Sequence, residues 1–171
     1  MARGTGRKSS RIAPGLALFF LVAAACRALA GGELTGVPEV IEGDVIALRG
    51  HRIRLFGIDA PEPGQRCRFR EKLYDCGEIS RSALMDLTAG TEVACTTLGE
   101  GPGDTVVALC RAGGYDLSEG MVYTGWALPV ERGEERYGRQ LEQAKSKGHG
   151  LWRGSFVAPW DWARGQRLPE E

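Results

Sequence analysis

The stretch RIRLFGIDAPE, residues 52–62, alternates arginine with apolar residues and then ends in a carboxylate, a proline and a second carboxylate. Such alternation is typical of a half-buried β-strand, whose side chains point to opposite faces in turn. Arg52 and Arg54 therefore belong to one face of this strand. Asp59 and Glu62 follow where it ends, because Pro61 cannot donate a hydrogen bond to a continuing ladder. One strand thus carries two guanidinium groups and two carboxylates toward the same end of a fold.

The segments around this strand predict a small sheet. Two short runs precede it, EVIEGD at residues 39–44 and VIALRG at residues 45–50, and the glycines between them indicate turns. The three runs form a meander of strands. Further along, TEVACTTL at residues 91–98 and TVVALCRA at residues 105–112 flank the loop GEGPGD and predict a hairpin.

Helices are predicted where apolar residues recur every three or four positions. This spacing occurs at about residues 78–89 and at about residues 134–147. A shorter helix at residues 117–124 begins after Asp116, whose spacing from Glu119 matches a capping box. Five strands with about three helices indicate an α+β fold, a small five-stranded β-barrel of the OB-fold type.

The first thirty residues have the composition of a secretory signal peptide. A basic start precedes the apolar run GLALFFLVAAAC, and small residues lead to Ala30, after which we expect cleavage and export to a periplasmic or secreted location. An uncleaved membrane anchor and a lipoprotein attached at Cys26 are the alternatives. Because the apolar run is short for a membrane span, we expect no stable membrane association after cleavage. Residues 31–38 are expected to be a linker.

Cleavage would change the charge of the chain. The full sequence has 22 basic and 22 acidic residues, and the first thirty residues hold five of the basic ones and none of the acidic ones. The exported chain would keep 17 basic and 22 acidic residues, a net charge of about −5. Such a chain has no overall attraction for polyphosphates, so a nucleic acid would have to bind a local basic site.

Four cysteines remain after cleavage, namely Cys67, Cys76, Cys95 and Cys110. An even number in an oxidising compartment favours two disulfides. Of the three possible pairings, we favour Cys67 with Cys76, which closes one loop, and Cys95 with Cys110, which lie on the two strands of the predicted hairpin. A zinc site is the alternative, but the sequence has no Cys-x-x-Cys pair to support it.

The carboxylates near the strand ends suit metal-assisted hydrolysis of a phosphodiester. In a meander, the turn that holds Asp44 can lie close to the strand end at Asp59. Oxygens from these two side chains and from the backbone carbonyl of Ala60 would suit calcium, a hard cation. Glu62 could accept a proton from water, and an arginine of the same strand could bind the phosphate. Taken singly, the aspartates are also common turn formers, Glu62 a loop acid and the arginines a solvated face.

The segments EGDVIAL (residues 42–48) and RIRLFGIDAPE closely resemble the thermonuclease, or staphylococcal nuclease-like, family. The likeness continues through DLSEGMVYTGWAL and KGHGLW and covers roughly residues 40–152. It implies an OB-fold barrel with helices and a calcium-dependent nuclease acting on DNA or RNA. By this resemblance, Asp44 and Asp59, with the Ala60 carbonyl, hold calcium; Glu62 is the general base and Arg54 binds the phosphate.

The sequence departs from the family pattern at position 105. The family places a second phosphate-binding arginine there, in a Y-G-R segment, whereas this chain has Thr105 after an acidic loop. Loss of an arginine that neutralises phosphoryl charge can cost roughly 1,000- to 100,000-fold in turnover. Another arginine could substitute from a different direction; the candidates are Arg52, Arg66, Arg68, Arg111 and Arg139.

Two functions are compatible with these residues. The first is an exported calcium-dependent nuclease that acts, as a monomer, on single-stranded or denatured nucleic acid. The second is a nuclease fold with little turnover that serves as a binding or interaction module, which Thr105 and the negative net charge favour. In both, residues 39–154 form the thermonuclease-like domain and residues 155–171 an irregular tail. Tyrosines and tryptophans of the second half are expected to pack internally rather than stack on bases; they are Tyr123, Trp126, Trp152, Trp160 and Trp162.

Overall fold

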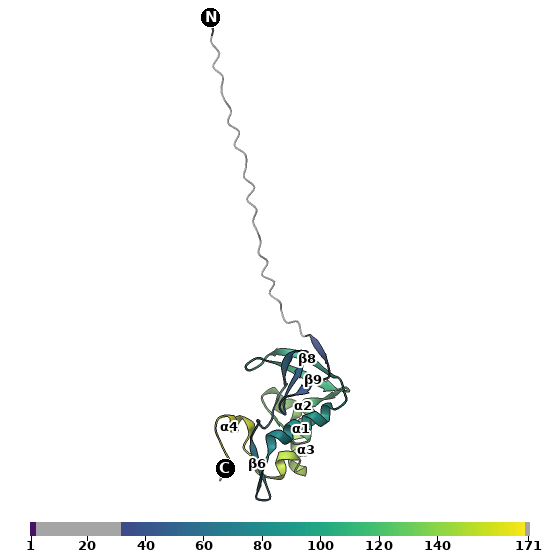
Figure 1. Ribbon diagram of the computed structural model, residues 1–171, viewed down its shortest axis with the longest axis vertical. Helices are drawn as coiled ribbons and strands as arrows, with labels where there is room; N and C mark the ends of the chain where they lie inside the picture. Colours follow the sequence, from purple (N-terminus) through teal and green to yellow (C-terminus); the bar gives the residue numbers. More distant parts are fainter. Residues whose placement is uncertain (3–31, 170–171) are drawn as a thin grey trace.

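The computed structural model describes residues 1–2 and 32–169 (Figure 1). The expected signal peptide, apart from its first two residues, and the expected cleavage site after Ala30 lie outside the described residues. Among the helices of the described part, none has the length and apolar character needed to span a membrane.

One strongly curled sheet forms the centre of the fold. In the described residues it has seven strands, which are β1 (Glu33–Gly36), β2 (Glu39–Val40), β3 (Val45–Leu48), β4 (His51–Leu55), β8 (Val93–Glu100), β9 (Thr105–Ala112) and β10 (Tyr115–Asp116). The order is β1-β8-β9-β4-β3-β2, with β10 paired to β9. The predicted meander is confirmed as antiparallel β2, β3 and β4, and the predicted hairpin as β8 and β9. β4 runs parallel to β9, which joins the two halves of the sheet.

The three predicted helices are confirmed within a few residues at each end. They are α1 (Cys76–Thr88), α2 (Leu117–Tyr123) and α3 (Arg132–Lys147). Side chains cap two of them: Asp75 accepts from the Glu78 N–H, and Asp116 accepts from Ser118 and Glu119, so the first orphan donors of α1 and α2 are satisfied. α3 ends at Lys147 and is capped by Gly148, whose left-handed φ of 63° a glycine adopts without strain. The predicted α+β fold is thus confirmed.

The main core joins the inner face of the sheet to the helices. Ile46 and Ile53 of the sheet, Leu84 of α1 and Met121 of α2 are fully buried in one cluster. Burying a side chain of this size contributes about 1.5 to 3 kcal/mol. This core fixes the strand ends that carry the candidate site.

Three segments differ from the expectation. Residues 33–36, inside the expected linker, form β1, because Leu34 packs against the core and the strand pairs with β8. The expected loop between Cys67 and Cys76 is mostly a hairpin of β6 (Arg66–Phe69) and β7 (Lys72–Asp75). Its turn uses Arg70 and Glu71 at positive φ, so it lacks the glycine that usually signals such a turn. The tail expected to be irregular includes a helix, α4 (Pro159–Ala163).

Both favoured disulfides are confirmed. Cys67 of β6 is bonded to Cys76, the first residue of α1. Cys95 and Cys110 are directly opposite each other on β8 and β9. The first disulfide therefore fastens the β6–β7 hairpin to a helix, and the second crosses the central hairpin.

Candidate active site

The register of β3 and β4 brings Asp44 to Arg54. Val45 lies opposite Arg54, and the Leu55 N–H donates to the Asp44 carbonyl oxygen at 2.8 Å. The Arg54 guanidinium then reaches the Asp44 carboxylate, with Nη1 donating to Oδ2. The same Nη1 lies 3.7 Å from Oδ1 of Asp59. A single guanidinium therefore links the two aspartates.

Asp59 is positioned by a second, small sheet. It ends β5 (Ile58–Asp59), which pairs with β11 (Leu128–Pro129). The turn before β5 passes through Gly57 at a φ of 72°, which brings the chain back after β4. Ala60 follows Asp59 directly, so its carbonyl belongs to the same strand end.

Gly43 allows the turn before Asp44 to approach this strand end closely. A Cβ at Gly43 would lie 1.9 Å from Ser80 Oγ and 2.8 Å from the Ala60 Cβ. Real side chains do not tolerate such distances, so only glycine fits between α1 and the strand end. The structure therefore brings together four of the predicted site residues: Asp44, Arg54, Asp59 and Ala60.

The two aspartates lie in an environment that disfavours negative charge. Asp44 is 2% exposed, and burial raises its pKa to about 8 although Arg54 acts in the opposite direction. Burial also raises the pKa of Asp59, again against Arg54. Glu42 and Glu62 add further negative potential at Asp44. One guanidinium compensates this charge only in part, and a bound cation would lower these pKa values.

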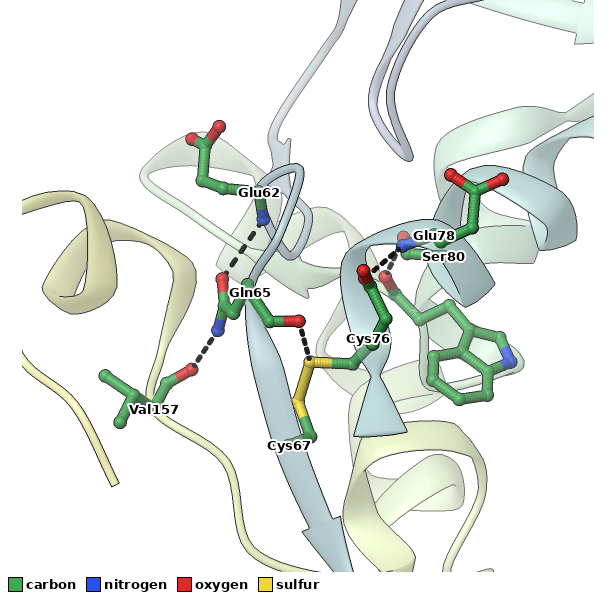
Figure 2. The surroundings of a disulfide bond; sticks show 9 residues. Glu62, Gln65, Cys67, Cys76, Glu78, Ser80 and Val157 are labelled. Atoms are coloured by element: carbon green, nitrogen blue, oxygen red, sulfur yellow. Dashed lines mark hydrogen bonds between the residues drawn. A yellow bond between two sulfur atoms is a disulfide. The ribbon is translucent and has the colours of Figure 1, made fainter. Parts of the chain in front are cut away.

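Glu62 lies on the loop that follows Ala60 and is half-buried. Burial raises its pKa, and the negative charges of Glu42 and Asp59 raise it further. It is thus within the electrostatic reach of the aspartate pair, although it does not line the pocket beside Arg54. Figure 2 shows its carboxylate pointing away from the neighbouring disulfide.

The Glu62 loop is anchored by Gln65, a residue that the sequence analysis did not single out. Gln65 is 0% exposed; its Oε1 accepts from the Glu62 N–H at 3.1 Å, and its Nε2 donates to the Val157 carbonyl at 2.8 Å (Figure 2). Its own carbonyl accepts from the Cys76 N–H at 3.0 Å, beside the Cys67–Cys76 disulfide. The loop, the tail and the start of α1 are therefore held together at one buried residue, through its side-chain amide and its backbone carbonyl.

A pocket of about 420 Å³ opens beside Arg54 and Asp59. Its other walls come from the turn after β4, the end of β8 and the start of α3. Arg132, which also lines it, lies with its guanidinium carbon 5.5 Å from the centre of the Phe56 ring. Sequence reasoning missed Arg132, because only packing of α3 on the β4–β5 turn places it here.

Thr105 is not aimed into this pocket. It is 8% exposed, and its hydroxyl donates to the Pro102 carbonyl at 2.6 Å. Its direct neighbour in the parallel pair of β4 and β9 is Arg52. Arg52 lies between two carboxylates, with Nε 3.4 Å from Asp104 and Nη2 3.8 Å from Glu42.

Arg52 is therefore the candidate substitute nearest to position 105. None of the five candidates, Arg52 included, lines the pocket. The other four lie on other elements: Arg66 and Arg68 in β6, Arg111 in β9 and Arg139 on α3. Alternation along the strand already placed Arg52 beside Arg54. The contacts with Glu42 and Asp104 appear only in the folded chain.

The oxygen atoms at this site suit a hard cation that has few protein ligands. Within the described residues there is no group of three or more His, Cys, Asp or Glu side chains arranged to hold a metal. Two carboxylates, Asp44 and Asp59, and the Ala60 carbonyl are oxygen donors of the kind that calcium accepts. Calcium takes six to eight oxygens, so water and a substrate phosphate would have to complete its coordination.

Comparison with known proteins shows the family to which the chain belongs. A family model described as "Staphylococcal nuclease homologue" matches residues 52–154, which include β4 from Arg52 onward, both hairpins and α1 to α3. The chain belongs to the staphylococcal nuclease family. The resemblance found in the sequence is thus confirmed, and the curled sheet with three main helices agrees with this family's fold.

Relatives in this family carry different names. The chain is 34% identical over 128 residues to the succinoglycan biosynthesis protein ExoI of Rhizobium meliloti (strain 1021), covering 72% of this chain and 67% of that protein. It is 31% identical over 127 residues to the probable staphylococcal-like nuclease CAN3 of Oryza sativa subsp. japonica, covering 72% of this chain and 31% of that protein. The rice protein CAN2 is 30% identical over 127 residues, with 72% and 32% covered. The chain spans about a third of these two rice proteins.

Proposed function

We propose that this member of the staphylococcal nuclease family is an exported, monomeric, calcium-dependent nuclease that hydrolyses phosphodiester bonds of single-stranded or denatured DNA or RNA. The observation that carries the proposal is the Arg54 guanidinium shared by Asp44 and Asp59 at the mouth of a 420 Å³ pocket. Export is supported by the two disulfides, which persist in oxidising compartments.

Calcium would be held by Asp44, Asp59 and the Ala60 carbonyl. The raised pKa values of the two aspartates support this role, because they reflect negative charge that Arg54 alone does not compensate. When bound, the cation supplies positive charge beside a phosphate oxygen and makes the phosphorus easier to attack.

Arg54 would bind a non-bridging oxygen of the scissile phosphate. Its side chain lines the pocket, and its ion pairs with Asp44 and Asp59 are both made through Nη1. The guanidinium therefore has donor capacity that its two aspartates do not use. A charge-assisted bond of this kind strengthens as negative charge develops on the phosphate.

Glu62 would act as general base on the attacking water. Its raised pKa moves it toward the range in which a carboxylate accepts a proton effectively near neutral pH. The oxygen of the water forms the new bond to phosphorus, its proton goes to Glu62, and the sugar oxygen leaves with the bonding electron pair. Gln65 would hold the loop of this base in place.

A second function, binding with little turnover, is favoured by one observation. Thr105 is turned toward Pro102, and Arg52 beside it is already paired with Asp104 and Glu42. In place of the family's second phosphate-binding arginine, the described chain therefore has near this position only the Arg52 guanidinium, which is already paired with two carboxylates. In this case the pocket would bind nucleic acid and release it uncut.

The two functions are separated by a cleavage assay on the exported chain with its disulfides intact. Heat-denatured DNA is incubated with calcium or with a chelator, beside Glu62→Gln and the control Glu92→Gln, an exposed acid preceding β8. We expect cleavage only with calcium, loss in E62Q of at least about 100-fold, and no loss in E92Q. An uncut substrate that nevertheless binds would favour the binding module. Equal cleavage in E62Q, or in chelator, would contradict the proposed chemistry.

A further inference from the structure

Two segments of the described chain have more basic than acidic side chains. These are the β6–β7 hairpin, residues 66–75, and the described part of the tail with the two residues before it, residues 153–169; we call the two segments together the basic surface. The basic surface has seven basic and three acidic side chains, whereas the rest of the described residues has ten basic and seventeen acidic ones. Glu170 and Glu171, which follow, lie outside the described residues. A local excess of this kind is what an acidic chain needs to attract a polyanion.

The hairpin and the tail are one surface rather than two. Arg68 and Ser155 exchange two backbone hydrogen bonds, at 2.8 and 2.9 Å, and Arg68 Nη2 donates to the Pro169 carbonyl at 2.7 Å. Between them, a Cβ at Gly154 would lie 2.0 Å from the Arg68 carbonyl oxygen, so the backbones are in direct contact. Figure 1 shows the β6 hairpin and the C-terminal end side by side, at the end of the fold opposite β1.

Most of this charge is exposed and not paired within the described residues. Arg66, Arg70, Lys72, Arg153 and Arg167 are exposed. Of the seven basic groups, only Arg164 has a described carboxylate within ion-pair distance, that of Asp161 at 2.6 Å. By contrast, Arg52 and Arg54 at the candidate active site are each paired with two carboxylates.

Aromatic rings hold several of these guanidinium groups. The guanidinium carbon of Arg153 lies 5.1 Å from the centre of the Phe69 ring, and that of Arg70 lies 5.0 Å from the same ring. Arg167 lies 4.2 Å over Trp162. A guanidinium resting on a ring loses less side-chain entropy when it binds a phosphate, and partly exposed rings between arginines are also stacking platforms for unpaired bases.

We propose that the basic surface binds the phosphate backbone of a single-stranded nucleic acid and carries the strand to the Glu62 loop. β6 begins at Arg66, directly after Gln65, the amide that anchors this loop and also contacts the tail at Val157. The identity of the ligand rests on the proposed function. Binding itself needs neither calcium nor cleavage, so it is tested separately from that function.

The test measures fluorescence anisotropy of a labelled oligothymidylate of about 20 nucleotides with the exported chain, in chelator, over a range of salt concentrations. The variants are R70Q/K72Q in the hairpin and R153Q/R167Q on the C-terminal side of the basic surface; all four groups lack a carboxylate partner among the described residues. The control R139Q/K147Q removes two exposed charges from α3. Each contact with a single strand contributes about 0.7 to the slope of log affinity against log salt, so each variant should lower the slope by about 1.4. Its affinity should fall at least tenfold at about 0.1 M salt.

The control should change affinity by less than about twofold. An equal loss in the control would overturn the proposal, because only net charge would then matter. Unchanged binding in both variants would overturn it as well, and so would tighter binding of heparin or of anionic lipid vesicles than of the oligonucleotide. A wild type that binds but does not cut with calcium would instead contradict the proposed nuclease. If the wild type cleaves DNA and both variants bind the oligonucleotide as tightly as the wild type, only the proposed role of the basic surface is contradicted.

Discussion

At the scale of the residue, Arg54 has two tasks that compete. It compensates the buried carboxylate of Asp44 and, in the proposed function, binds a phosphate. A cation between the aspartates would take over the first task. Calcium binding and phosphate binding should therefore favour each other: calcium compensates the aspartates and frees Arg54 to bind the phosphate, and a phosphate on Arg54 leaves the aspartates to the calcium ion.

Calcium is expected to raise the melting temperature of the wild type, because a ligand that binds only the folded state stabilises it by mass action, by about 2.7 kcal/mol at a concentration 100 times Kd. Asp44→Asn should abolish this rise, since it removes a carboxylate donor. Differential scanning calorimetry with and without calcium measures the difference. Asp86→Asn, on the exposed side of α1, is the matched control and should keep the rise. A rise of the same size in D44N would place the ion elsewhere.

Thr105→Arg tests the residue by which this chain departs from its family. A guanidinium at this position would add positive charge beside the developing oxyanion, so calcium-dependent cleavage should increase at least about tenfold. The increase should vanish in the double variant with Glu62→Gln, because charge without an activated water leaves attack slow. The assay is initial-rate cleavage of denatured DNA. No gain, with calcium still bound, would mean that the 101–104 loop holds this position away from the site or that Arg52 already fills the role.

At the scale of the element, the Cys67–Cys76 disulfide ties the β6–β7 hairpin to the first turn of α1. Gln65 lies at the same junction and holds the backbone of Glu62. The position of the proposed base thus depends on a crosslink between two elements. The Cys95–Cys110 disulfide, which crosses the central hairpin, has no such contact with the Glu62 loop.

The two disulfides should therefore differ in their effect on turnover. Cys67→Ser/Cys76→Ser and Cys95→Ser/Cys110→Ser should each lose about 2 to 4 kcal/mol of unfolding free energy, the usual cost of a native disulfide. Only the first pair should lower kcat in the folded protein, with KM little changed. Steady-state kinetics at a temperature at which both variants are folded, checked by circular dichroism, gives the comparison. Equal kcat values would argue against a positioning role for the junction.

At the scale of the whole molecule, α3 closes the pocket by direct backbone contact with the β4–β5 turn. A Cβ at Gly133 would lie 1.7 Å from the Gly57 carbonyl oxygen, whereas a Cβ at Gly138, one and a half turns further along α3, would meet nothing within 4 Å. The first glycine is required by packing, and the second is not. Arg132 reaches the pocket because of this contact.

Gly133→Ala should consequently destabilise the fold by about 1 to 3 kcal/mol, as overpacking of a close contact does. Gly138→Ala should stabilise it by about 0.5 to 1 kcal/mol, because alanine costs less backbone entropy than glycine within a helix. Urea denaturation followed by circular dichroism measures both. If G133A is as stable as the wild type, α3 does not rest on Gly57.

The hydrophobic pattern and the turn residues by themselves determined the meander, the central hairpin, the three main helices and both cysteine pairings. Those features depend on periodicity, capping and spacing, which are local. They also determined which acidic and basic side chains stand at the strand ends, and the family resemblance assigned their roles. The β6–β7 hairpin escaped prediction, because its turn places Arg70 and Glu71 at positive φ without a glycine.

Only the tertiary structure decided what those side chains contact. Arg54 links Asp44 to Asp59 because the registers of two separate sheets bring three strand ends together. Gln65 is held by a hydrogen bond to Val157, which is 92 residues further along the chain. Arg132 reaches the site because α3 packs on the β4–β5 turn. The basic surface, likewise, forms because the tail returns to pair with β6. Contacts between distant segments depend on the packing of the entire core, which no local pattern of residues encodes.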